Sequence, residues 1–174
     1  MTQNKLKMYT LITGGSEGIG KALAAECASR KMNLILAALP DTYLKETAQA
    51  LRSEFGVDVI PIGIDLTEMD APKKIWAFCR DKNLTVNILI NNAGITGSTV
   101  FEEASLDYID LRIHLNIRAL VMLTRLFLPE LKKLERAYIL NVSSMSAFYP
   151  IPFKSIYSAS KAFVLNFSKA VREE

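Results

Sequence analysis

The stretch that decides the fold is YTLITGGSEGIG, residues 9–20. Its first five residues form a short β-rich run, and a helical pattern follows the glycines to about Arg30. Gly14, Gly18 and Gly20 would let the backbone turn tightly and approach a pyrophosphate, while the N–H groups at the helix start point toward the anion. The stretch therefore predicts a strand, a phosphate-binding glycine turn and a helix, with a purely structural turn as the alternative.

Strands and helices alternate along the rest of the chain. Further strands are expected at residues 33–38, 57–62, 86–90 and 138–142, and helices at 41–55, 71–80, 105–134 and 155–172. The second strand is too apolar to alternate, which is typical of a parallel sheet covered on both faces. Residues 1–174 are therefore predicted to form one Rossmann-like α/β domain, a doubly wound parallel sheet that binds ligands at the carboxyl ends of its strands.

Composition argues against several classes of function. The 174 residues are 50% hydrophobic with a net charge of +3, and the scattered lysines and arginines do not suggest a nucleic-acid partner. The N-terminus lacks the apolar core of a signal peptide, and the most apolar window, residues 119–129, is shorter than the roughly 18 residues of a membrane span. Cys27 and Cys79 are expected to be reduced, buried thiols, and a single histidine gives no support for a metal site. A cytoplasmic protein without a membrane partner is predicted.

Tyr157 and Lys161 are the first candidates for chemistry. They lie four residues apart in the first turns of the last predicted helix, so both side chains fall on one face. A neighbouring Lys⁺ stabilises a phenolate, so Tyr157 could move a proton at neutral pH. The alternative is a packed tyrosine beside a solvated lysine, and the pair needs support from other parts of the chain.

Support comes from motifs spread along the whole chain. They are Thr13-Gly14-x-x-x-Gly18-x-Gly20, Asp65, Asn91-Asn92-Ala93-Gly94, Asn116, Ser144 and Tyr157-x-x-x-Lys161. In this order and register they resemble the short-chain dehydrogenase/reductase family, in its shorter, single-domain branch.

The resemblance implies an oxidoreductase that transfers a hydride between NAD(P) and a secondary alcohol or ketone. Tyr157 would be the general acid in carbonyl reduction or the base in alcohol oxidation, and Ser144 would polarise the substrate oxygen. Lys161 would also hold the nicotinamide ribose, and Asn116 would kink its helix and hold a water that completes a proton relay. Ser143 is expected to be structural. The apolar loop before Tyr157 indicates a hydrophobic substrate.

The resemblance also implies the cofactor-binding residues. Asp65 would contact the adenine, and Asn91 to Gly94 would line the cofactor cleft and, with Thr13, brace the central strands. The predicted set is Gly14, Ser16, Glu17, Gly18, Ile19, Gly20, Asp65, Leu66, Asn92, Ala93, Gly94, Tyr157 and Lys161.

The preference between NAD and NADP is less clear from the sequence. Ala38 stands where NAD-preferring relatives usually place an acid, and Leu39 stands where NADP-preferring relatives usually place an arginine. Glu17 would repel a 2′-phosphate and Asp41 could reach a ribose, which favours NAD slightly.

The chain ends at Glu174, whereas members of this branch continue with two further strands and a substrate loop. A chain truncated at its C-terminus, with the fifth strand at the rim of the sheet, is therefore expected. Relatives commonly dimerise, which predicts a homo-oligomer with contacts through residues 105–134 and 155–172. Two alternatives to the reductase stay open: a non-catalytic dinucleotide-binding module that acts as a sensor or scaffold, and an epimerase or dehydratase of the larger branch.

Overall fold

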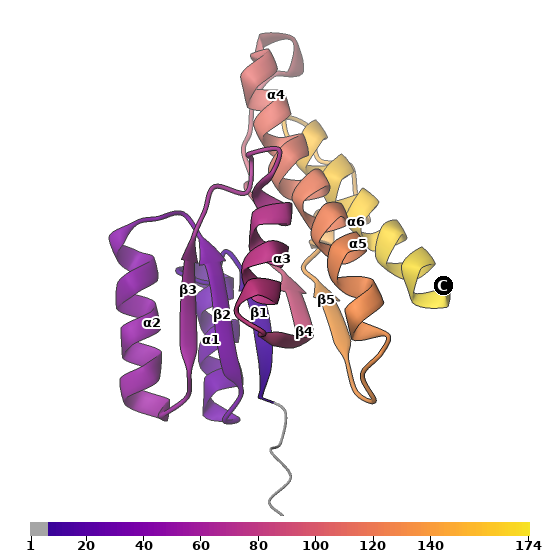
Figure 1. Ribbon diagram of the computed structural model, residues 1–174. Helices are drawn as coiled ribbons and strands as arrows, with labels where there is room; N and C mark the ends of the chain where they lie inside the picture. The colour runs from indigo at the N-terminus through magenta and orange to yellow at the C-terminus, as the bar shows by residue number, and fades with distance from the viewer. Residues whose placement is uncertain (1–6) are drawn as a thin grey trace, which may run out of the picture.

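The computed structural model describes residues 7–174 and contains a five-stranded parallel sheet between layers of helices (Figure 1). The strand order is β3-β2-β1-β4-β5. The strands are β1 (Met8–Thr13), β2 (Asn33–Ala38), β3 (Val59–Gly63), β4 (Thr85–Asn91) and β5 (Tyr138–Asn141). The chain builds outward from β1 to β3 and then returns to add β4 and β5 on the other side. The predicted doubly wound parallel sheet is thereby confirmed, with its topological switch between β1 and β4.

The helices mostly follow the predicted bounds. They are α1 (Gly18–Ser29), α2 (Thr42–Phe55), α3 (Ala71–Asp81), α4 (Leu106–Ile113), α5 (Ala119–Leu131) and α6 (Ser155–Glu173). The helix predicted from residue 41 begins one residue later because Asp41 is its cap, accepting a hydrogen bond of 3.0 Å from the Leu44 N–H.

The single helix predicted over residues 105–134 is wrong in detail. The structure divides it into α4, a π-helical segment (His114–Arg118) and α5, and α5 ends at Leu131. Asn116 lies in the π-helical segment, fully buried, and its amide bonds both backbone groups of Ile95. A π segment adds a residue to one turn and is frequent at functional sites. The structure thus has a widened π-helical turn at Asn116, where the sequence predicted a kink.

Two hydrophobic cores, one on each face of the sheet, hold the layers together. Leu11 and Leu89 belong to the core beneath α3 and α5, whereas Ile12 and Leu36 belong to the core beneath α1 and α2. Successive strand residues point to opposite faces, so a strand that is buried on both faces must be apolar throughout. This explains why the second strand does not alternate.

The two cysteines were predicted to be reduced and buried, and the structure agrees only in part. Cys27 and Cys79 are both free thiols, but only Cys79 is buried, and burial raises its pKa to about 12. Cys27 is half-buried, contrary to the prediction, because it lies toward the edge of the buried face of α1.

On β5, which forms one edge of the sheet, Tyr138 is 62% exposed. Among residues 7–174, none of the helices combines the length and apolarity that crossing a bilayer requires.

Candidate active site

A cleft of about 670 Å³ opens at the carboxyl ends of the strands, over the switch between β1 and β4. Every residue of the predicted cofactor-binding set lines it. Asn91, which was also expected to line the cleft, does not: it is buried, and its amide donates to Thr124 and Asn141. Of the four predicted catalytic residues, Tyr157 and Lys161 line this cleft, whereas Asn116 and Ser144 lie outside its lining. The remaining lining residues are Ala38, Leu39, Asp41, Ile64, Thr67, Ile95, Thr96, Leu111, Leu115, Val142 and Ser143.

The glycine turn forms one wall of the cleft through close backbone contacts. Gly14 and Gly18 have φ values of +63° and +52°, a left-handed conformation that favours glycine. A Cβ on Gly20 would overlap the Gly14 carbonyl oxygen. Gly20 therefore allows the start of α1 to pack against the Gly14 turn, and the first turn of this helix lines the cleft, where a helix N-terminus can bind a phosphate.

Thr13 and Asn92 join the glycine turn to β4, as the sequence predicted. The Thr13 hydroxyl accepts hydrogen bonds of 3.0 Å from the N–H groups of Asn92 and Ala93. The Asn92 amide donates to the carbonyls of Thr13 and Gly14, at 2.9 and 3.1 Å. These contacts cross the switch point and fix the two central strands at the base of the cleft.

The opposite wall carries Tyr157 and Lys161, on the first turns of α6. Lys161 is 5% exposed, and its ammonium donates a hydrogen bond of 2.9 Å to the Val142 carbonyl. The same nitrogen lies 5.8 Å from the centre of the Tyr157 ring. Burial lowers the pKa of Lys161, because no carboxylate of residues 7–174 is hydrogen-bonded to it to offset the loss of hydration.

Asn116 connects this wall to the end of β4. Its amide oxygen accepts from the Ile95 N–H at 2.8 Å, and its nitrogen donates to the Ile95 carbonyl at 2.9 Å and to the Ser160 hydroxyl at 3.2 Å. The Ser160 hydroxyl donates in turn to the Tyr157 carbonyl at 2.7 Å. A Cβ on Gly94 would lie 3.2 Å from the Asn116 amide oxygen and 3.4 Å from the Lys161 nitrogen, so these three residues meet.

The two neighbouring serines after β5 have different surroundings. The Ser143 hydroxyl donates to the Lys161 carbonyl at 2.8 Å, which fits the structural role expected of it, although Ser143 also lines the cleft. The Ser144 hydroxyl contacts Ser146, with 3.2 Å to the N–H and 3.0 Å to the hydroxyl. Ser144 is half-buried at the start of a short 3-10 turn (Met145–Ala147).

Three carboxylates occupy the other end of the cleft. Asp65 accepts hydrogen bonds from its own turn, from the Thr67 N–H at 2.9 Å and the Thr67 hydroxyl at 2.7 Å. Asp41 is held by the Leu44 N–H, and Glu17 is exposed. Among the residues that line the cleft, Lys161 is the only lysine or arginine, so this end is acidic.

Sequence reasoning missed Arg112, Ser146 and Ser160. Arg112 is 6% exposed and donates hydrogen bonds of 2.9 Å to the carbonyls of Tyr108 and Thr96, holding the segment that follows Gly94. An arginine on a helix usually indicates a solvated face, so nothing near it in the sequence signals this role. The position of Ser160 between Tyr157 and Lys161 was the one available signal for that residue.

A parallel sheet of this order, with a glycine turn and a Tyr/Lys pair on opposite walls of a cleft at the switch point, defines a dinucleotide-binding α/β domain. The sequence profile of the short chain dehydrogenases matches residues 8–174, and the chain therefore belongs to this family. The resemblance predicted from the motifs is confirmed.

Among curated proteins, the chain is 36% identical over 172 residues to the very-long-chain 3-oxoacyl-CoA reductase of Bos taurus, covering 95% of this chain and 54% of that protein. It is 37% identical over 171 residues to 17-beta-hydroxysteroid dehydrogenase type 3 of Homo sapiens, again covering 95% and 54%. The chain thus spans about half the length of the curated relatives that it matches.

Solved structures agree in fold. The short-chain dehydrogenase from Sphingobium yanoikuyae in complex with NADPH is 36% identical with a TM-score of 0.88, covering 94% of this chain and 63% of that one. The bulky-bulky ketone specific alcohol dehydrogenase from Comamonas testosteroni is 32% identical with a TM-score of 0.88, covering 95% and 66%. Both likenesses agree with the observed sheet and helix arrangement.

Proposed function

We propose that this chain carries the cofactor-binding and proton-transfer groups of an NAD(P)-dependent oxidoreductase that interconverts a ketone and a secondary alcohol. The observation that carries the proposal is that Tyr157 and Lys161 line the same cleft as the glycine turn of residues 14–20. A nicotinamide cofactor supplies the hydride when it is bound there. The chain's own contribution is to align the reacting groups and to move one proton.

The residues present fit a dinucleotide. The first turn of α1 would hold the pyrophosphate, because Gly18, Ile19 and Gly20 at the start of this helix line the cleft. Asp65 and Leu66 would border the adenine, and Lys161 would hold the ribose next to the nicotinamide. The Lys161 ammonium has three N–H donors and gives one to Val142, so two are left for ribose oxygens.

Tyr157 would deliver the proton. In the reductive direction its phenol donates to the substrate oxygen, and the buried Lys161 ammonium stabilises the phenolate that this leaves. Ser144 would donate a second hydrogen bond to the same oxygen. Asn116 and Ser160 would keep the backbone of Tyr157 in place through their linked hydrogen bonds.

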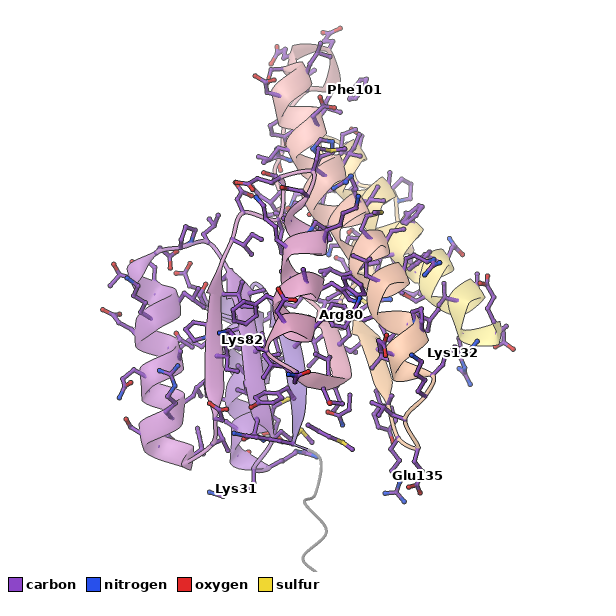
Figure 2. The ribbon with its side chains drawn as sticks, viewed as in Figure 1. Lys31, Arg80, Lys82, Phe101, Lys132 and Glu135 are labelled. Atoms are coloured by element: carbon purple, nitrogen blue, oxygen red, sulfur yellow. The ribbon has the colours of Figure 1, made fainter. Side chains whose placement is uncertain are left out.

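Apolar side chains near the cleft support a hydrophobic substrate. The loop before α6 exposes Phe148, Ile151 and Phe153, and Figure 2 shows Phe101 beside the upper end of α4. The Thr99 N–H donates to the Phe153 carbonyl at 2.8 Å, which joins these two segments. The names of the relatives refer to acyl, steroid and bulky ketone substrates, which agrees with a ketone flanked by apolar groups.

The acidic end of the cleft supports NAD over NADP. Glu17, Asp41 and Asp65 would repel a 2′-phosphate, and Leu39 provides no positive charge after β2. The NADPH-bound relative differs from this chain at nearly two thirds of the aligned positions, so its NADPH is a property of that protein. Calorimetric titration with NADH and NADPH tests the preference, and Leu39→Arg should increase NADPH affinity more than NADH affinity.

Substitution of Tyr157 by Phe tests the proposed chemistry. We expect ketone reduction to fall by about 10² to 10⁴-fold, the size of a lost general acid, with cofactor affinity unchanged. The assay uses a panel of an aliphatic acyl ketone, a steroid ketone and a small sugar ketone. Tyr149→Phe is the matched control, because Tyr149 is an exposed phenol in the preceding loop. Cofactor binding without turnover of any ketone would favour a non-catalytic dinucleotide-binding module instead.

The same proposal includes a homo-oligomer. α4 and α6 pack together, and Phe163 on α6 is 41% exposed beside Phe167, with 5.8 Å between the ring centres. An exposed phenylalanine stacked on a half-buried one, on a long helix, is suited to a contact between copies. Sedimentation equilibrium of the wild type and Phe163→Glu tests this contact. A cytoplasmic location stays a prediction from the sequence.

A further inference from the structure

We propose that Ser146 is a positioning residue that orients the Ser144 hydroxyl, so that the Ser144 proton is directed to the substrate oxygen. The inference rests on the proposed function, because it assigns a partner to the residue that would polarise the carbonyl. Ser146 does not line the cleft and would act only through Ser144.

The two serines form a closed local arrangement. Ser144 precedes the 3-10 turn of Met145–Ala147, and its hydroxyl oxygen lies 3.2 Å from the Ser146 N–H and 3.0 Å from the Ser146 hydroxyl. The Ala147 N–H donates to the Ser144 carbonyl at 3.0 Å and closes the turn. Both polar groups of Ser146 therefore point at one oxygen atom.

The direction of the hydrogen bond between the hydroxyls follows from burial. Ser146 is 6% exposed, and Ser144 is the only partner that its hydroxyl has among the described residues. If Ser144 donated, the Ser146 proton would be buried without an acceptor, which costs about 1–3 kcal/mol. If Ser146 donates, the proton without a partner belongs to Ser144, a residue that is only half-buried, so the cost is smaller. The second arrangement is favoured.

This arrangement determines what Ser144 can do. A hydroxyl has two acceptor sites and one donor, and here Ser146 fills both acceptor sites. Ser144 is left as a pure donor, which suits a ketone oxygen. In the oxidative direction the substrate hydroxyl would give its proton to the Tyr157 phenolate and still accept from Ser144. The same polarity of Ser144 serves both directions.

A double-mutant cycle tests the proposal. With the ketone that the wild type reduces fastest, Ser146→Ala should lower kcat about three- to tenfold, the size of one lost hydrogen bond, with the KM for the cofactor unchanged. Ser144→Ala should lower kcat by about 10²-fold or more. In the Ser144→Ala background, Ser146→Ala should have no further effect, because its target is gone. Equal losses in both backgrounds would show that Ser146 acts in another way and would overturn the proposal.

Ser168→Ala separates positioning from general loosening. The Ser168 hydroxyl also makes two hydrogen bonds, accepting from Asn141 at 2.9 Å and donating to the Val164 carbonyl at 2.6 Å, but it lies outside the cleft lining. We expect the kcat of the Ser168→Ala variant to equal that of the wild type. A fall as large as that of Ser146→Ala would mean that any lost hydroxyl in this region slows the reaction, which also contradicts the proposal.

Denaturant unfolding tests the contact between Ser144 and Ser146 without any need for ketone reduction. If the wild type reduces no ketone, the proposed function fails, but the contact between the two serines is still measurable by denaturant unfolding. The two substitutions should then be non-additive, with Ser146→Ala raising the unfolding equilibrium constant less in the Ser144→Ala background than in the wild type. Strict additivity would show that the hydroxyls are not coupled and would reject the proposal.

Discussion

The two walls of the cleft are built in opposite ways. The wall formed by the glycine turn is made of backbone, and a Cβ on Gly20 would overlap the Gly14 oxygen. The wall formed by α6 depends on buried polar side chains: Lys161 lines it, and Asn116 of the π-helical segment lies behind it. The glycine turn requires residues without a Cβ, whereas the wall formed by α6 requires specific polar side chains.

This difference follows from what each wall would contact. A pyrophosphate is recognised by N–H groups that must approach closely, which leaves no room for a Cβ. Proton transfer instead needs donors held at defined angles, and such donors must be buried and hydrogen-bonded to one another. We therefore expect the glycine wall to be damaged by an added atom and the polar wall by a removed one.

The largest effect is expected from Gly20→Ala. Alanine in place of glycine normally stabilises a helix by up to about 1 kcal/mol. Here the new methyl group meets the Gly14 backbone and the Asn92 amide, neither of which can move without opening the turn. We expect a loss of about 3 kcal/mol in the free energy of unfolding, measured with urea, and loss of NADH binding by calorimetry. A variant as stable as the wild type would show that the turn yields easily.

Asn116→Ala should have the next largest effect. The change removes both hydrogen bonds to Ile95 and the one to Ser160, and it leaves buried polar groups unpaired. We expect a loss of about 2 kcal/mol by urea unfolding. Asn166→Ala is the control, because Asn166 is an exposed asparagine of α6 that bonds only its own helix, and its loss should be below about 0.5 kcal/mol. Equal losses of unfolding free energy in the two variants would show that the buried hydrogen bonds of Asn116 do not stabilise the protein more than an exposed one does.

The glycine wall could be predicted almost completely from the sequence. A turn that requires left-handed φ at Gly14 and Gly18 can be recognised locally, because few other residues adopt it. The apolar strands that flank it are equally local signals, and β2 was predicted without error. The Tyr157 and Lys161 pair was also found because helical spacing places its members on one face.

The polar wall was predicted less completely because its contacts join segments that are far apart in the chain. The widened turn at Asn116 depends on Ile95, and the burial of Arg112 depends on the Thr96 carbonyl. Neither partner can be identified from spacing. Ser146 was missed for a different reason: a serine two residues after another is common in loops, and its role appears only when the 3-10 turn brings the two hydroxyls together.

Gly18→Ala tests whether conformation alone damages the glycine wall. A Cβ on Gly18 has no atom within 4 Å, so only its φ of +52° opposes the substitution, at about 1 kcal/mol. Gly56, which ends α2 with a φ of +64° and equally open space, is the matched control. We expect the same loss of stability in both alanine variants, but weaker NADH binding only for Gly18→Ala. Equal NADH affinity in the two variants would mean that this part of the turn does not approach the cofactor.

The smallest effect on stability is expected from Lys161→Met, and this substitution should stabilise the protein, whereas the others destabilise it. A buried ammonium without a carboxylate partner opposes folding, so its replacement should raise the free energy of unfolding at pH 7 by roughly 0.5 kcal/mol, while NADH affinity falls. Because burial lowers the pKa of Lys161 below its ordinary 10.5, the unfolded wild type binds more protons than the folded one as the pH approaches 10.5. The free energy of unfolding of the wild type should then rise with pH toward 10.5, and its difference from that of Lys161→Met should shrink. Lys169→Met, at an exposed position of α6, should leave the pH profile unchanged. If Lys161→Met is less stable than the wild type at every pH, the Lys161 hydrogen bond to Val142 outweighs the loss of hydration, and the polar wall is stabilised by its charge.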